Sequence, residues 1–286
     1  MTVSSLAQYS FAFNDFIFGN GTPYSIQNID GLTALPVITN QDDDSGYSDG
    51  MFTGTDFIRS RTVNIHILTT SGNGHSAAYN FNLLRKALLP QRAGVTPLQF
   101  QLGAENVLQR VNGRVRGMAT PLDPDYTYGQ ILSMWTFFCP DPIIYDDMLK
   151  TSTILVSAVS GRTYNRIYPL VYGGGSASFY TPVVNDGDWE TLPVITINGP
   201  IINPTVGNFT TGKSIVINGT YIAGDVIIID LNSKLITLNG VSARNLITGA
   251  SKWFTAPAGT TQFYLTGSGT LVGTTSATVA YHSAYI

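Results

Sequence analysis

The chain has 286 residues, of which 43% are hydrophobic and only 12% are charged. This composition excludes a disordered chain and supplies enough apolar material for one large or two medium domains. The formal net charge is -3, with 9 basic and 13 acidic residues in 1–150 against 6 and 5 in 151–286, and no basic stripe that would indicate direct binding of duplex DNA.

Short strands and an exposed loop are predicted for the first part of the chain. The phenylalanine-rich residues 11–18, and residues 24–29 and 35–39, have the apolar and β-branched content of strands and are separated by turns that contain Gly, Asp or Pro. Residues 40–54 are polar and rich in glycine, which predicts an exposed loop.

A strand with clear alternation and the one good helix come next. Over residues 56–69 apolar and polar side chains alternate, but Arg59 and Arg61 fall on the otherwise apolar side. We therefore expect the early part of this strand to emerge from the core. Residues 77–89 have apolar side chains at helical spacing between the candidate N-cap Ser76 and Pro90. Further strands are predicted at 97–102, 106–118 and 128–138.

The second half is predicted to consist of strands and turns. Candidate strands lie at residues 153–159, 168–172, 192–197, 213–217, 226–230, 234–238, 262–265 and 277–281. The pairs Asn198-Gly199, Asn218-Gly219 and Asn239-Gly240 favour tight type I′ hairpins, because Asn and Gly adopt positive φ. Short strands at this spacing predict a β-sandwich, and we place the domains at residues 1–148 and 149–286.

Side chains that carry catalysis or bind metals form no recognisable motif. Cys139 is the single cysteine, which excludes a disulfide within the chain and a cysteine-based zinc site. His66, His75 and His282 have no second ligand at metal-binding spacing, and no Gly-x-Ser-x-Gly motif is present. We therefore expect no enzymatic activity, no metal site and no cofactor.

Acidic residues occur in two groups. Asp42, Asp43 and Asp44 lack the spacing of a calcium-binding loop, so a solvated acidic loop is favoured over a calcium site. Asp186 and the acidic residues that follow it cluster in a turn-like segment. This arrangement is typical of a loop, whereas a glycosidase needs two carboxylates on opposed surfaces.

Aromatic residues provide the one credible binding chemistry. Trp189 and Trp253 are the candidate carbohydrate-binding residues, with Tyr221, Phe254 and Tyr264 in the same half, since the apolar face of a pyranose stacks on an exposed ring. Aromatic residues of a sandwich more often belong to its core or to a subunit interface. A lectin-like protein that contacts a cell surface is therefore kept as the alternative function.

The N-terminal residues predict no secretion signal. Residues 1–6 lack a basic region and a long apolar core, and no apolar run in the chain is long enough to span a bilayer. We expect a chain that stays in the cytoplasm until it assembles.

Segments throughout the chain resemble, in order, the distal tail proteins of long-tailed, non-contractile bacteriophages. In the first half they are Tyr24–Leu32, Asp49-Gly50, Arg59–Leu68 and Trp135–Tyr145. In the second half they are Asn185–Asp188, Leu192–Pro204, Thr211–Ile217, Ala223–Asp230, Leu238–Val241 and Trp253–Gly259. Each segment is a weak motif, and it is their succession over nearly the whole chain that is specific.

The resemblance implies a structural protein of the virion that is assembled in the host cytoplasm and has a mainly β fold. It implies a tail-tube-like β-sandwich or barrel with one helix at residues 1–148, and a galectin-like β-sandwich at residues 149–286. It further implies a homo-hexameric ring that joins the tail tube protein to the tail-tip hub protein and anchors a receptor-binding protein. DNA would pass through the lumen without specific binding, and Asp42, Asp43 and Asp44 are candidates to face that lumen.

Overall fold

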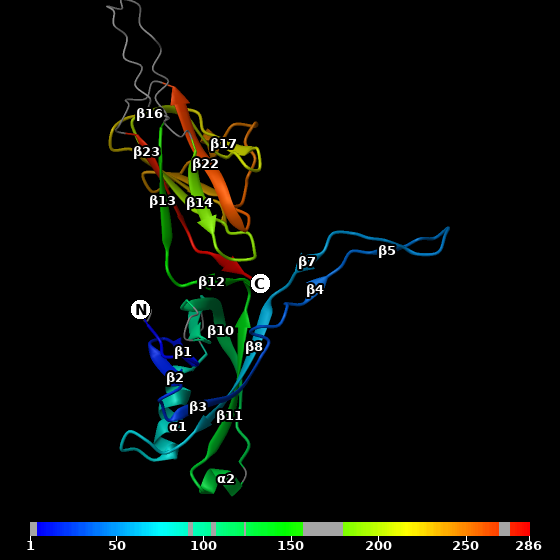
Figure 1. Cartoon of the computed structure of the whole chain (residues 1–286), viewed down its shortest axis with the longest axis vertical. Coiled ribbons are helices and arrows are strands. Elements are labelled where there is room, and N and C mark those ends of the chain that lie inside the picture. The colour runs from blue at the N-terminus through cyan, green and yellow to red at the C-terminus, as the bar shows by residue number, and fades with distance from the viewer. Residues whose placement is uncertain (1–4, 91–93, 104–106, 123, 157–179, 269–274) are drawn as a thin grey trace, which may run out of the picture. The chain divides into compact units, whose positions relative to one another are not determined.

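The computed structural model describes residues 5–90, 94–103, 107–122, 124–156, 180–268 and 275–286, which form two compact units (Figure 1). Unit 1 comprises residues 1–148 together with Tyr285–Ile286, and unit 2 comprises Leu149–Ala284. The chain therefore passes from unit 1 to unit 2 at Met148, and the last two residues return to unit 1. Both units are built mainly from strands, and the predicted mainly β class is confirmed.

Unit 1 is organised around one antiparallel sheet with the strand order β2-β1-β9-β10-β11-β8-β3. These strands are β1 (Ser10–Phe13), β2 (Phe16–Gly19), β3 (Tyr24–Asp30), β8 (Arg61–Thr69), β9 (Thr96–Gln101), β10 (Gln109–Ala119) and β11 (Ile131–Cys139), and the short β12 (Ile144–Asp146) pairs with β10. Alternate residues of β8 and β11 are buried, so the period-2 pattern of the sequence sets which side of the sheet faces the core.

Aromatic residues fill the core of unit 1. Phe11 stacks on both Phe18 and Phe100 with 5.7 Å between ring centroids, and Phe13 meets Phe137 edge to face at 5.4 Å. The buried Trp135 donates its indole N–H to Ser133 Oγ at 2.9 Å, which satisfies the polar atom of the largest side chain in this core.

The predicted helix is confirmed as α1 (Ala77–Ala87). The Oγ atom of Ser76 accepts a hydrogen bond from the N–H of Tyr79, as expected of an N-cap. Its buried face consists of Ala77, Asn80, Phe81 and Leu84. One further helical turn, α2 (Pro124–Thr127), has no buried residue and was not predicted.

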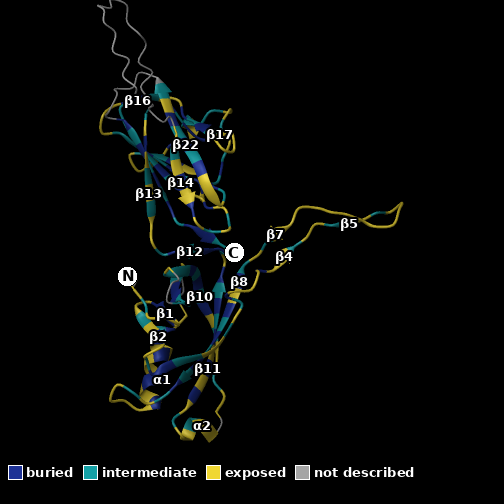
Figure 2. Cartoon of the chain, viewed as in Figure 1, coloured by how far each residue is buried: buried dark blue, intermediate teal, exposed yellow. Residues whose placement is uncertain are grey.

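Residues 38–58 form a two-part hairpin that leaves the sheet before β8, and we call residues 35–58 the arm (Figure 1). Its strand β4 (Ile38–Thr39) pairs with β7 (Phe57–Ile58), and β5 (Asp43–Asp44) pairs with β6 (Met51–Phe52). The prediction of an exposed loop over residues 40–54 was right about exposure but missed this pairing (Figure 2).

Unit 2 is a sandwich of two antiparallel sheets around an aliphatic core. One sheet has the order β13-β23-β15-β19-β20-β21 and the other the order β14-β22-β16-β17, with β18 on β16. The first consists of β13 (Lys150–Leu155), β15 (Val194–Asn198), β19 (Val226–Asp230), β20 (Leu235–Leu238), β21 (Val241–Ser242) and β23 (Ser276–Tyr281). The second consists of β14 (Thr181–Asn185), β16 (Ile201–Asn208), β17 (Lys213–Val216), β18 (Thr220–Tyr221) and β22 (Gly259–Ser268).

The Asn-Gly pairs of unit 2 make different connections. Asn239 and Gly240 have φ values of 51° and 82° and join β20 to β21 as a two-residue hairpin, as predicted. Asn198-Gly199 instead carries the chain from β15 in one sheet to β16 in the other, so the hairpin predicted there is wrong. The predicted strand at 168–172 lies outside the described residues.

Candidate interaction surfaces

The arm carries a concentration of exposed apolar side chains. Leu35, Val37 and Phe52 are 71%, 67% and 69% exposed, and Met51 and Phe57 are also exposed. An isolated two-stranded hairpin has marginal stability in water, because it buries little apolar surface. An exposed apolar surface on a segment of this kind is typical of a protein–protein contact.

Polar contacts hold the two sides of the arm in register. The carboxylate of Asp42 accepts a hydrogen bond from the N–H of Gly54 at 3.0 Å and another from the side chain of Asn40 at 2.8 Å. Asp43 and Asp44 lie in β5 and are exposed. Of the three predicted lumen residues, Asp42 is therefore occupied in holding the hairpin, whereas the other two present their charges to solvent.

The base of the arm is fixed by a buried arginine. Arg61 is only 2% exposed, although the sequence pattern predicted that this part of the strand emerges from the core. Its guanidinium donates hydrogen bonds to the carbonyl oxygens of Gly31 and Ala34 before the arm, at 3.0 and 2.8 Å, and to that of Pro142 at 2.8 Å. It also donates to the carbonyl oxygen of Leu32 at 2.5 Å. Arg61, which follows the arm in the sequence, thus binds the backbone segment that precedes the arm.

Backbone carbonyl groups replace the hydration of Nε and Nη1 of the buried Arg61, whereas its Nη2 has no hydrogen-bond partner within the described residues. The expectation from alternation was wrong because it weighs only side-chain polarity, whereas the backbone supplies the partners here. Burial lowers the pKa of the Arg61 guanidinium from its usual value. Burial also raises the pKa of the neighbouring Cys139 to about 12, so its thiol stays neutral and packs as a small apolar group.

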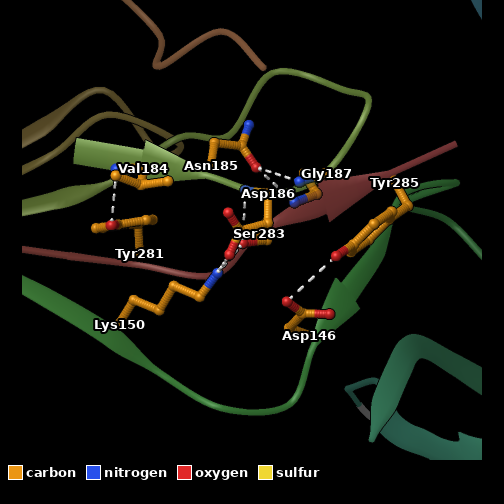
Figure 3. Close-up of polar contacts among 10 residues, drawn as sticks. Asp146, Lys150, Val184, Asn185, Asp186, Gly187, Tyr281, Ser283 and Tyr285 are labelled. Atoms are coloured by element: carbon orange, nitrogen blue, oxygen red, sulfur yellow. Dashed lines mark hydrogen bonds and ion pairs between the residues drawn. The ribbon is translucent and has the colours of Figure 1, made fainter. Parts of the chain in front are cut away.

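A second polar cluster lies where the chain enters and leaves unit 2 (Figure 3). The buried carboxamide of Asn185 donates to the carbonyl oxygen of Trp189 at 2.6 Å and accepts from the N–H groups of Gly187 and Ala284 at 3.2 and 3.1 Å. A side chain on Gly187 would collide with the carbonyl oxygen of Ala284, since its Cβ would lie only 1.8 Å away.

An ion pair completes this cluster. Lys150, the first residue of β13, donates to the carboxylate of Asp186 at 2.5 Å and to Ser283 Oγ at 2.6 Å. Residues at the entry and the exit of unit 2 are therefore bound to the same turn, so the turn-like Asp186 segment has a structural role.

The last residues of the chain contact unit 1. The hydroxyl of Tyr285 lies 3.4 Å from the carboxylate of Asp146 within this unit (Figure 3).

The two tryptophans proposed for carbohydrate binding are partly buried. The N–H of Trp189 donates to the carbonyl oxygen of Ala284 at 3.0 Å, and Trp253 packs against the core of the sandwich. Tyr221 and Phe254 belong to that core. Carbohydrate binding by Trp189 and Trp253 stays a prediction. Phe209, which was not among the predicted binding residues, is one of the exposed large apolar residues of unit 2.

Within the described ranges, no group of three or more His, Cys, Asp or Glu side chains is arranged to hold a metal ion. Among the same residues, no helix has the length and apolar character needed to cross a membrane.

Comparison with known proteins identifies relatives among bacteriophage tail components. Residues 186–285 match the family model described as the C-terminal domain of siphovirus-type tail components. No curated protein matches the chain significantly. The Dit protein (gp 19.1) of phage SPP1, described as a paradigm of the hub of the adsorption apparatus in phages that infect Gram-positive bacteria, shares 14% identity over 97% of this chain and 99% of its own, with a TM-score of 0.65.

A chain of the phage P2 baseplate, in the activated conformation with Ca, shares 14% identity over 96% of this chain and 97% of its own, with a TM-score of 0.48. The same baseplate with Sr gives 15% identity, the same coverage and a TM-score of 0.49.

The mainly β fold and the family match define a structural component of a bacteriophage tail, and hence of the virion. Within this class, residues 186–285 match the C-terminal domain of siphovirus-type tail components, and the whole chain has a fold similar to that of the SPP1 Dit protein. Its relatives are structural tail proteins rather than enzymes.

We predict that Arg61→Met lowers the stability of unit 1 by about 3 kcal/mol, because it leaves buried carbonyl groups without donors. Hydrogen exchange of residues 31–34, measured by mass spectrometry on the full chain, should speed up accordingly. The exposed Arg59, whose guanidinium donates to the hydroxyl of Thr39, offers the control, and Arg59→Met should change stability by less than about 0.5 kcal/mol. Equal exchange in the two variants would contradict the anchoring role of Arg61.

Proposed function

We propose that copies of this protein close into a hexameric ring at the end of the tail, which joins the tail tube to the tail-tip hub. The fold supports this proposal, since the SPP1 Dit protein of similar fold is described as part of a hub of the adsorption apparatus. In this function the protein works by holding neighbours in place, and the ring leaves a central channel for the DNA.

The observation that carries the proposal is the apolar arm. Leu35, Val37 and Phe52 expose apolar side chains on this hairpin. Among the described strands, those of the hairpin pair only with each other, so no larger sheet buries these side chains. A single projecting arm favours a head-to-tail contact, in which the arm of one copy meets a different surface of the next copy. Contacts of this kind produce closed rings when the rotation between neighbours divides a full turn.

The charge of residues 1–150 supports a channel function. This part of the chain has an excess of acidic over basic residues, and like charges keep the DNA backbone from adhering to a channel wall. In this proposal unit 1 provides the ring contact and the channel, and unit 2 anchors a receptor-binding protein. The position of Asp42, Asp43 and Asp44 in the lumen is part of this proposal.

We expect Val37→Asp combined with Phe52→Asp to abolish ring formation, because two buried charges without partners destabilise an apolar interface. Native mass spectrometry and negative-stain images of the purified protein at high concentration measure the ring population. The matched control is Ile222→Asp in unit 2, where the side chain is 68% exposed, and it should leave the rings intact. Rings that persist in the double variant would exclude the arm as the contact between copies. Absence of the wild-type protein from the rings seen at purified tail tips would contradict the ring proposal.

We also expect the triple change of Asp42, Asp43 and Asp44 to Asn to slow DNA ejection from virions, since it removes repulsion between the channel and the DNA. The measurement is the ejection rate of purified virions, followed by dye binding to released DNA. Asp188→Asn, at an exposed position of unit 2, is the control for a change of charge outside the proposed channel. Ejection at the wild-type rate in virions that carry the triple variant would show that these residues do not act on the DNA.

A further inference from the structure

One face of the smaller sheet of unit 2 presents aromatic rings outward. Along β22, Thr261, Phe263 and Leu265 are buried, so the residues between them point away from the sandwich core. Tyr264 is one of these outward residues, and it lies opposite Gly207 of β16. The burial pattern thus separates Phe263, which packs in the core, from its neighbour Tyr264, which does not.

Gly207 allows the ring of Tyr264 to lie close to the sheet. A Cβ atom at position 207 would be 2.6 Å from the Tyr264 ring, so only glycine leaves room for the ring here. A ring that covers the backbone in this way directs one of its faces to the sheet and the other outward. Tyr264 is correspondingly only partly exposed.

Two further rings adjoin Tyr264. The centroid of Tyr180 lies 4.4 Å from that of Phe209 and 6.3 Å from that of Tyr264, the second pair at an interplanar angle of 89°. The N–H of Phe209 donates to the carbonyl oxygen of Gln262 at 2.7 Å, which fixes Phe209 beside β22. We call Tyr180, Phe209 and Tyr264 the aromatic platform.

The exposure of the platform is not needed by the fold. Phe209 is 57% exposed, whereas Phe254 and Phe263 of the same unit are 2% and 0% exposed and meet edge to face within the core. Solvent-facing rings held by neighbouring rings lose little side-chain entropy on binding, because their orientation is already restricted.

The other outward groups of β22 beside the platform are uncharged and polar. The other outward residues of β22 from Thr260 to Thr266 are Thr260, Gln262 and Thr266, and the Oγ atom of Thr210 lies 3.1 Å from the N–H of Gln262. Hydroxyl and amide groups next to ring faces suit a ligand that has both apolar C–H faces and hydroxyl groups. Three rings are also too few for a stable protein interface, which buries about 800 Å² on each partner.

We propose that the aromatic platform binds a neutral carbohydrate, with a pyranose ring stacked on Phe209 and Tyr264 and its hydroxyl groups directed to Gln262 and the flanking threonines. This function goes beyond the ring proposed above and does not depend on it. It assigns carbohydrate contact to the smaller sheet of unit 2 rather than to Trp189 and Trp253.

Titration of the full-length protein with cellohexaose, maltohexaose and chitohexaose tests this proposal, with saturation-transfer NMR to detect contact and calorimetry to measure affinity. We expect weak binding of at least one oligosaccharide. Phe209→Ala should weaken it about tenfold or more, because it removes one stacking surface. Tyr264→Ser should have a similar effect.

The matched control is Tyr128→Ala in unit 1, where the side chain is 82% exposed and lies outside both the arm and the platform, and it should leave binding unchanged. Thermal melting verifies that each variant is folded. Absence of binding to all three oligosaccharides would overturn the proposal. So would binding that survives Phe209→Ala but is lost in Trp253→Phe, since the sugar would then lie on the tryptophan. A loss of self-association in Phe209→Ala, without an effect on sugar binding, would assign the platform to a protein contact instead.

Discussion

The exposed apolar side chains of the arm, which favour burial against another surface, are the constraint on which the account of unit 1 depends. Among the described strands, those of the arm pair only with each other, so the hydrogen bonds of the arm cannot compensate for the exposure of Val37 and Phe52. The rest of unit 1 supplies what such a segment needs, namely a rigid sheet with an aromatic core and a fixed point of departure. A tail component that works by joining copies would use this combination, because a contact surface transmits force only when its base does not move.

At the base of the arm, the buried charge of Arg61 holds neighbouring backbone segments in place. Arg61 binds carbonyl oxygens on the segment before the arm and at Pro142, so three parts of the chain distant in sequence meet at one guanidinium. Unit 2 uses the same device with neutral groups, since Asn185 joins its own turn to Ala284 near the end of the chain. In both units, side-chain hydrogen bonds to backbone fix the places where the chain leaves a regular sheet.

The sequence predicted regular elements well and connections less well. The period-2 and period-3.6 patterns identified β8 and α1, because side-chain burial follows directly from those periods. The same reasoning failed at Arg61, where the partners are backbone carbonyls that have no signature in the sequence. Asn-Gly indicated the hairpin at Asn239-Gly240 but not the change of sheet at Asn198-Gly199, since a local turn preference does not specify which sheet the next strand joins. Tyr264 was among the aromatic candidates in the sequence, but its grouping with Phe209 and Tyr180 was missed, because only strand register brings these residues together.

The most direct test of the account is to ask what covers the arm in the assembled tail. A photoreactive benzophenone side chain introduced in place of Phe52, followed by irradiation of purified tails and mass spectrometry of the cross-linked peptides, reports the surface that lies against this position. The account predicts that the cross-link joins the arm of one copy to a peptide of unit 1 in a second copy. Cross-links that reach only a different protein, or that stay within a single chain, would contradict it.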